Sequence, residues 1–227
     1  LAGVPTLLSR DVIANGGYQL PSGEWVGTFM GLSPAVAWLL RVLLVYAYGF
    51  VWLLVGWWTY LVYRDNYRHA DWAPVDDMVG RFRNHSWGLF GLAVIFAFVV
   101  LAVFAPALGP TTVEANIADP YLHSIEYYDS ETGGVEEIYV GDANGESQSR
   151  GQGGENVGPM SYDQYNRFHP FGTLPSGKDL FTFMAAGARV SLFIGVLSLL
   201  LAGGAAMAFA LATAYYKGLV DLGVVIA

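Results

Sequence analysis

The chain has 227 residues and no cysteine, so disulfide bonds and thiolate metal ligands are excluded. It is also poor in lysine: only Lys178 and Lys217 are lysines among 11 basic residues, against 19 acidic residues, and the formal net charge is -8. A surface of this sign repels phosphate, so nucleic acid is not expected as a partner. The acid-rich, lysine-poor composition also fits a high-salt habitat.

The sequence lacks the patterns that indicate catalysis or a resident cofactor. It has no Gly-x-Ser-x-Gly motif, no glycine loop followed by Lys-Ser or Lys-Thr, and no paired carboxylates in its apolar runs. The region 142–146 has only a faint likeness to the oxygen spacing of a calcium loop. The histidines are scattered and predict no metal cluster; they are His69, His85, His123 and His169. We therefore predict neither an enzyme nor a cofactor in this chain.

Hydrophobic residues make up 54% of the chain and are concentrated in three long runs without charge, Val42–Val62, Trp87–Leu108 and Val190–Tyr216. About 20 apolar residues cross a hydrocarbon core about 30 Å thick, so each run is long enough to span a membrane. The first run is too long and too far from the start for a signal peptide. Because the chain opens without methionine and ends inside a further apolar stretch, we interpret it as a fragment.

The charges predict how the chain is oriented in a membrane. Four arginines lie between the first two runs, at Arg64, Arg68, Arg81 and Arg83. Basic loops stay in the cytoplasm, which places the region 109–179 on the outside. That region has twelve acidic and three basic residues, as expected of a solvated module.

These observations predict an all-α membrane protein, a helical transmembrane bundle with a mixed, partly irregular extracytoplasmic insert. Inside the insert we expect a strand and then a turn over Val135–Gly145, and a flexible loop over Ser147–Pro159. The predicted segments are 1–33 (external or interfacial), 34–63 (transmembrane helix), 64–86 (cytoplasmic basic loop), 87–108 (transmembrane helix), 109–179 (acidic insert), 180–216 (interfacial helix bent into a transmembrane helix) and 217–227 (cytoplasmic turn and the start of another helix).

Small residues recur along the third predicted transmembrane helix. Every fourth position of one row is Ser or Ala, and two glycines lie on an adjoining row; these residues are Gly195, Ser198, Ala202, Gly203, Ala206 and Ala210. Small residues let helix backbones approach closely in lipid, where hydrophobicity does not drive association. We predict that this helix packs inside a bundle, and the alternative is a plain anchor that is rich in alanine.

A polar junction, HPFGTLPSGKDLF from His169 to Phe181, connects the insert to this helix. The His-Pro pair predicts extended backbone, and the glycines that follow predict turns. Asp179 lies at the predicted helix start, where a negative charge is favourable, and Arg189 lies at the edge of the apolar run. The two charges are either simple helix-end charges or parts of a docking or gating device.

Three ordered blocks, HPFGTLPSGKDLF, GARVSLFIG and AYYKGLVD, resemble the permease subunits of dipeptide, oligopeptide and nickel ATP-binding-cassette importers, the second of their two permease types. The upstream stretch RFRNHSWGLFGLAVIFAFVVLAVFAPALGP is similar to the family's basic lead and first helix, so the resemblance extends over 81–221. Leu174, Lys178 and Lys217 depart from the usual Asp, Arg and Gly. The helix at 42–62 and the long insert lie outside the family pattern, and the Glu-Ala-Ala coupling helix is not matched.

The resemblance implies a type I permease in the plasma membrane that forms part of a peptide uptake pathway. Its implied partners are a second permease subunit, two ATPase subunits that bind ATP and Mg, and an external solute-binding protein. The implied motif residues at the external junction are His169, Pro170, Gly172, Thr173, Gly177, Lys178, Asp179, Gly187, Arg189 and Ser191. Those at the cytoplasmic turn are Tyr215, Tyr216, Gly218 and Asp221.

Other functions fit the sequence less well. Nickel and sugars remain open as solutes, because some members of the family take them. A membrane-anchored sensor or scaffold with an external ligand-binding segment is the main alternative, and it would require a signalling domain inside. A membrane-bound peptidase would require a catalytic constellation that the sequence does not contain.

Overall fold

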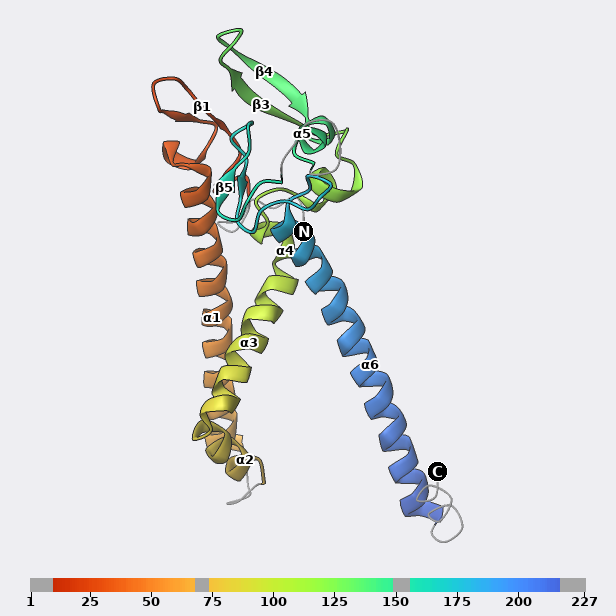
Figure 1. Ribbon diagram of the computed structural model, residues 1–227. Helices are drawn as coiled ribbons and strands as arrows, with labels where there is room; N and C mark the ends of the chain where they lie inside the picture. Colours follow the sequence, from red (N-terminus) through yellow and green to blue (C-terminus); the bar gives the residue numbers. More distant parts are fainter. Residues whose placement is uncertain (1–9, 68–73, 149–155, 217–227) are drawn as a thin grey trace. The chain divides into compact units, whose positions relative to one another are not determined.

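The computed structural model describes residues 10–67, 74–148 and 156–216 (Figure 1). Most of these residues are helical, and the sheets among them are small. The chain divides into two units, Leu1–Ala188 and Arg189–Ala227. The first unit holds nearly all of the tertiary packing, and the described part of the second, residues 189–216, is the greater part of one long helix.

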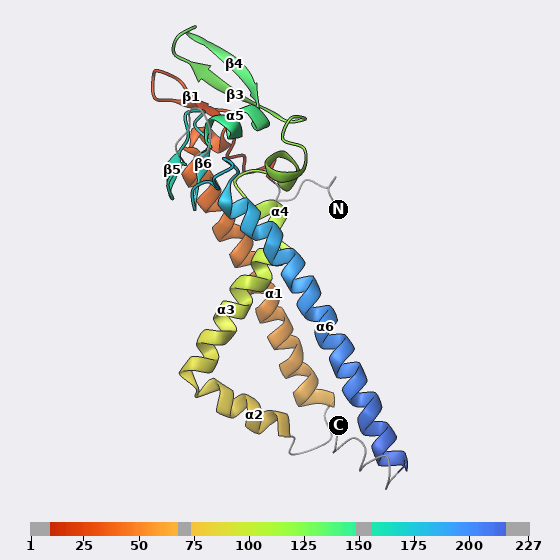
Figure 2. The ribbon, with the colours of Figure 1, turned by 45° about the vertical axis from the view of Figure 1, so that its right-hand side comes forward.

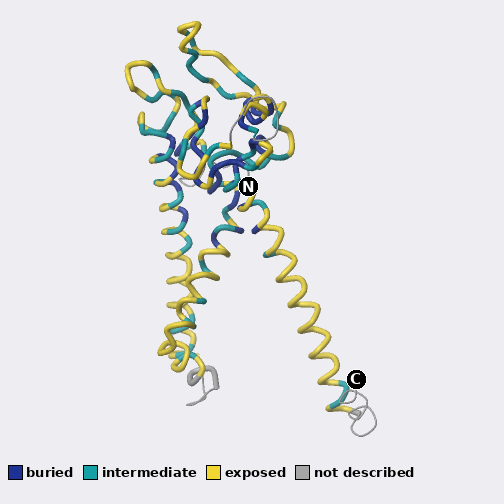
Figure 3. Tube along the Cα trace, viewed as in Figure 1, coloured by how far each residue is buried: buried dark blue, intermediate teal, exposed yellow. Residues whose placement is uncertain are grey.

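Among the described residues, three helices are long and apolar enough to cross a membrane: α1 (Pro34–Tyr67), α3 (Ser86–Val103) and α6 (Leu180–Tyr216). The most apolar windows of α1 and α3 are each 11% buried (Figure 3). Exposure of so much apolar surface to water is unfavourable, whereas contact of the same surface with lipid is favourable. The protein therefore has the helices of an integral membrane protein.

The helix boundaries differ from the sequence prediction in three places. The predicted helix 87–108 is divided into α3 and a short α4 (Ala105–Leu108), because Pro106 has no N–H and its ring disturbs the preceding turn. α6 is one helix from Leu180 to Tyr216, and the residues predicted to form an interfacial helix bent into it are its first turns. The predicted loop 64–86 contains the end of α1 and a further helix, α2 (Pro74–Arg83).

Helix α1 packs against α3 and α4. Val45, Val100 and Leu108 form the buried cluster between them. At Gly49 an added Cβ would lie 2.9 Å from Val100 Cγ2, so glycine permits this close approach. The helix at 34–63, which lies outside the family pattern, is thus packed into the first unit.

The described residues of 10–33 and 109–179 form the polar module of the first unit, and they contain three antiparallel two-stranded sheets. β1 (Tyr18–Gln19) pairs with β2 (Trp25–Val26), β3 (Ser124–Asp129) with β4 (Gly134–Tyr139), and β5 (Ser161–Tyr162) with β6 (Phe168–His169). The β1–β2 and β3–β4 hairpins lie side by side in both views (Figures 1 and 2). Short helical turns complete the module: η1 (Phe29–Gly31) and η2 (Glu114–Ala118).

The prediction for Val135–Gly145 is wrong in its second half. β4 ends at Tyr139, and α5 (Val140–Glu146) replaces the expected turn. The buried side of α5 includes Val140, Ala143 and Asn144, and an added Cβ at Gly141 would lie 2.4 Å from the Tyr121 ring. Packing on the rest of the module therefore selects helix for a glycine-containing segment that has little helical preference of its own. Residues 149–155 of the predicted flexible loop lie outside the described residues.

Candidate functional site at the start of α6

Asp179 immediately precedes α6 and is 1% exposed. Its Oδ1 accepts a hydrogen bond from the Thr182 N–H at 2.7 Å, which is the contact of a helix N-cap. The Asn116 side chain holds the Asp179 backbone on both sides, because its Oδ1 accepts from the Asp179 N–H at 2.8 Å and its Nδ2 donates to the Asp179 carbonyl at 3.1 Å. The first turn of α6 is thereby fixed to η2.

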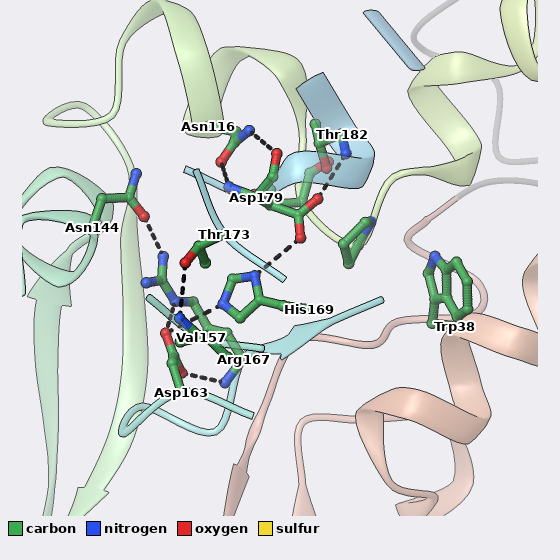
Figure 4. A network of polar contacts seen from close by, with 12 residues as sticks. Trp38, Asn116, Asn144, Val157, Asp163, Arg167, His169, Thr173, Asp179 and Thr182 are labelled. Carbon is green, nitrogen blue, oxygen red and sulfur yellow. Dashed lines mark hydrogen bonds and ion pairs between the residues drawn. The ribbon is translucent and has the colours of Figure 1, made fainter. Parts of the chain in front are cut away.

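His169 lies between two carboxylates (Figure 4). Its Nδ1 is 3.0 Å from Asp179 Oδ2, and its Nε2 is 3.6 Å from Asp163 Oδ2. Burial lowers the pKa of His169, but the charges of Asp163 and Asp179 and the hydrogen bond to Asp179 outweigh it, so the pKa lies above its ordinary value. The arrangement favours an imidazolium that bridges β6 and the start of α6.

Asp163 connects His169 to Arg167 in the β5–β6 turn, and Arg167 in turn contacts α5. Arg167 Nε donates to Asp163 Oδ2 at 2.6 Å, and Arg167 Nη1 donates to Asn144 Oδ1 at 2.8 Å. Burial raises the pKa of Asp163, but His169 and Arg167 outweigh burial and hold it below its ordinary value. The network therefore extends from α5 through β6 to α6.

Two glycines at the junction have backbone conformations that other residues rarely adopt. Gly172 has φ +81, and an added Cβ would lie 2.5 Å from the Val157 carbonyl oxygen. Gly177 has φ +75, and an added Cβ would lie 1.8 Å from the Asn144 carbonyl oxygen. Both positions need glycine for conformation and for space.

Thr173 and the backbone around it close the loop onto the helix start. Thr173 forms an isolated antiparallel bridge with Asp179. Its hydroxyl accepts a hydrogen bond from the Val157 N–H at 3.0 Å, and the Leu180 N–H donates to the Gly172 carbonyl at 3.0 Å. These hydrogen bonds hold the junction against the start of α6.

The structure thus brings together the first part of the predicted motif: His169, Pro170, Gly172, Thr173, Gly177, Lys178 and Asp179. Pro170 is fully buried, and Lys178 Nζ donates to the Ile117 carbonyl at 3.4 Å. Gly187, Arg189 and Ser191 follow on α6 and are exposed.

The predicted helix-packing residues and the cytoplasmic-turn residues lie in the second unit. Gly195, Ser198, Ala202, Gly203, Ala206 and Ala210 are all exposed, so their packing stays a prediction. Tyr215 and Tyr216 end α6, while Gly218 and Asp221 lie outside the described residues.

Sequence reasoning missed four residues of the network: Asn116, Asn144, Asp163 and Arg167. The pair Asp163 and Arg167 is spaced i,i+4 in a polar loop, which was the one available signal. Asn116 meets Asp179 across 63 residues of sequence, and no local pattern indicates such a contact.

A second buried polar cluster joins α1 to the residues that follow α4. Arg41 is 0% exposed and donates to the Ile13 carbonyl at 2.8 Å and to the Gly109 carbonyl at 2.9 Å. Arg10 donates to the same Gly109 carbonyl and to that of Thr111, and burial lowers the pKa of Arg10 to about 10, so it stays charged at neutral pH. Carbonyls after a helix end lack partners within the helix, and guanidinium groups satisfy them here.

The stability of the polar module is expected to fall at both high and low pH. The pKa of His169 is raised in the fold, so its contribution is complete below its ordinary value of 6.5 and is lost as the pH rises through the folded value. The pKa of Asp163 is lowered, so its contribution is present above 3.8 and is lost as the pH falls through the folded value. Thermal unfolding in detergent across this pH range measures the loss of stability at high pH (the alkaline limb) and at low pH. His169→Gln should reduce the loss at high pH, and an unchanged loss in that variant would refute its attribution to His169.

Comparison with known proteins finds a family match for one part of the chain. Residues 74–124 match the family model described as the N-terminal transmembrane domain of oligopeptide transport permease C. No curated protein and no solved structure matches the chain. The matched region contains α2, α3, α4 and η2 and ends at the first residue of β3, whereas the polar network at α6 lies beyond it. Together with the three candidate spans, the match supports an integral membrane protein with an OppC-like permease domain.

Proposed function

We propose that the chain is a permease subunit of an ATP-binding-cassette importer and forms part of the pathway by which peptides or related small solutes enter the cell. The match at residues 74–124 carries this proposal, because it coincides with α3, one of the three candidate membrane spans. The chain itself hydrolyses no ATP in this scheme. Its partners are a second permease subunit, two ATPase subunits that bind ATP and Mg, and an external solute-binding protein.

The proposed topology is multi-pass in the plasma membrane, with 64–86 in the cytoplasm and 109–179 outside. The arginines of 64–86 support it through the positive-inside rule. Because the chain has no cysteine, single cysteines report the side of the membrane cleanly. Glu131→Cys, at the exposed β3–β4 turn, should react with a membrane-impermeant maleimide in intact cells, whereas Arg83→Cys should react only after permeabilisation. The opposite pattern would overturn this topology.

In this scheme the polar network at α6 couples external docking to helix movement. Asp179 supports the idea because one side chain both caps α6 and contacts His169 of β6. A displacement of the insert would then reach α6 through hydrogen bonds and an ion pair. Alternating access in such transporters occurs by rigid-body movement of helices, which needs a stiff connection of this kind.

Peptide uptake by cells that contain the complete transporter tests the proposal. Deletion of the gene should abolish ATP-dependent accumulation of a labelled peptide, and restoration of the gene should recover it. Unchanged uptake in the deletion strain would refute the transport function, and ligand binding without uptake would favour a membrane-anchored sensor or scaffold.

Three substitutions at the junction test the coupling role. Gly172→Ala, Asp179→Asn and Arg189→Gln should each impair uptake or docking of the solute-binding protein, while the exposed control Glu131→Gln should not. Normal uptake and docking in all three variants would refute only the coupling role.

A further inference from the structure

A cavity of about 630 Å³ lies within the polar module of the first unit. Its walls come from the N-terminal segment 10–18, the segment 110–116, the β3–β4 hairpin and the region 165–169. Sites for small molecules usually have volumes of about 300–1,000 Å³, so the cavity is of suitable size for one.

The carboxylates of Asp11 and Asp179 line this cavity, and so do three cationic side chains: Arg10, Arg167 and His169. Each has a buried nitrogen without a hydrogen-bond acceptor among the described residues, namely Arg10 Nε, Arg167 Nη2 and His169 Nε2. His169 is 3% exposed, and Asp163 Oδ2 lies 3.6 Å from its Nε2, which is too far for a hydrogen bond. A buried donor without an acceptor is destabilising, and an oxyanion is the group that accepts hydrogen bonds from several charged donors at once.

Two carboxylates line the same cavity from the β3–β4 hairpin. Glu126 and Glu137 are direct cross-strand partners, and both are exposed. Like charges that face each other across two strands destabilise the pair. Ser124 Oγ donates to Glu137 Oε1, but this neutral contact leaves both negative charges in place. A cationic group beside the two carboxylates would relieve the repulsion.

We infer that the cavity binds a small zwitterionic molecule from the extracytoplasmic medium. Its carboxylate contacts the wall formed by Arg10, Arg167 and His169, and its ammonium group contacts Glu126 and Glu137. A doubly charged anion such as phosphate is disfavoured by the two glutamates, and a simple amine leaves the three buried donors without an acceptor. The cavity is lined by residues of this chain, and the extracytoplasmic origin of the ligand rests on the proposed topology.

Calorimetric titration of the full chain in detergent tests the inference with three molecules of equal length: 5-aminopentanoate, pentanoate and pentylamine. The zwitterion should bind about tenfold more tightly than either singly charged molecule, a difference of about 1.4 kcal/mol. Equal affinities for the three, or no saturable binding of the zwitterion at millimolar concentration, would overturn it.

A matched pair of variants tests the ammonium subsite without disturbing the buried network. Glu137 lines the cavity, whereas the adjacent Glu136 accepts a hydrogen bond from Tyr127 on the other face of the hairpin and does not line it. Glu137→Gln should weaken 5-aminopentanoate binding about two- to fivefold, as expected for an exposed ion pair, and should not weaken pentanoate binding. Glu136→Gln should leave both affinities unchanged. Equal effects of the two variants would overturn the proposed orientation.

Discussion

Gly177→Ala is expected to destabilise the polar module by about 3–5 kcal/mol, near the upper end for single substitutions. The added Cβ would lie 1.8 Å from the Asn144 carbonyl oxygen and 2.7 Å from its carbonyl carbon. These are backbone atoms of α5, so no side-chain rotation relieves the overlap. The positive φ of +75 adds a conformational cost of about 1–2 kcal/mol. Denaturant unfolding in detergent, monitored by near-ultraviolet circular dichroism, measures the change.

Gly23→Ala is the matched control for this substitution. Gly23 has a φ of +88, but an added Cβ there would meet no atom within 4 Å. It should cost only about 1–2 kcal/mol, the cost of the backbone conformation alone. The additional loss of stability in Gly177→Ala, beyond that in Gly23→Ala, then measures the effect of the close approach between the junction and α5. Equal losses in the two variants would show that this approach contributes nothing to stability.

The long helices were predictable because their composition alone requires a membrane. Uncharged runs of sufficient length specify a span whatever their neighbours are, and α1, α3 and α6 occupy the regions where the sequence indicates them. Helix ends were less predictable. Pro106 ends α3 by a local effect that the sequence does display, whereas the helical state of α5 depends on burial against Tyr121, which no local pattern reveals.

The candidate site was predictable at its turn residues and at the helix cap. Gly172, Gly177 and Asp179 have local roles, set by backbone conformation and by the helix terminus, so their residue types carry the information. Asn116, Asn144 and Asp163 act through contacts with distant segments. An amide that satisfies a distant backbone group leaves no periodic pattern, so sequence reasoning could place the junction without identifying what holds it.

The two functions of Asp179 predict different effects for two substitutions. Asp179→Ala removes both the cap of α6 and the buried partner of His169, and it is expected to cost about 3–5 kcal/mol, as for other broken buried ion pairs. Asp179→Asn keeps an oxygen that can accept from the Thr182 N–H, so it should be about 1 kcal/mol less destabilising, the usual contribution of an N-cap. Denaturant unfolding in detergent distinguishes the two variants. Equal losses would mean that the cap contributes nothing here.

The pH dependence of the Asp179→Asn variant separates its electrostatic role from its capping role. Asp179 and Asp163 both raise the pKa of His169 above its ordinary value of 6.5. Loss of one carboxylate should lower that pKa, so the alkaline loss of stability should begin at a lower pH than in the unmodified chain. A cap acts at every pH, whereas an ion pair acts only while the imidazole is protonated. An alkaline limb that stays in place in Asp179→Asn would therefore assign the stabilisation of α6 to capping alone and leave Asp163 as the charge partner of His169.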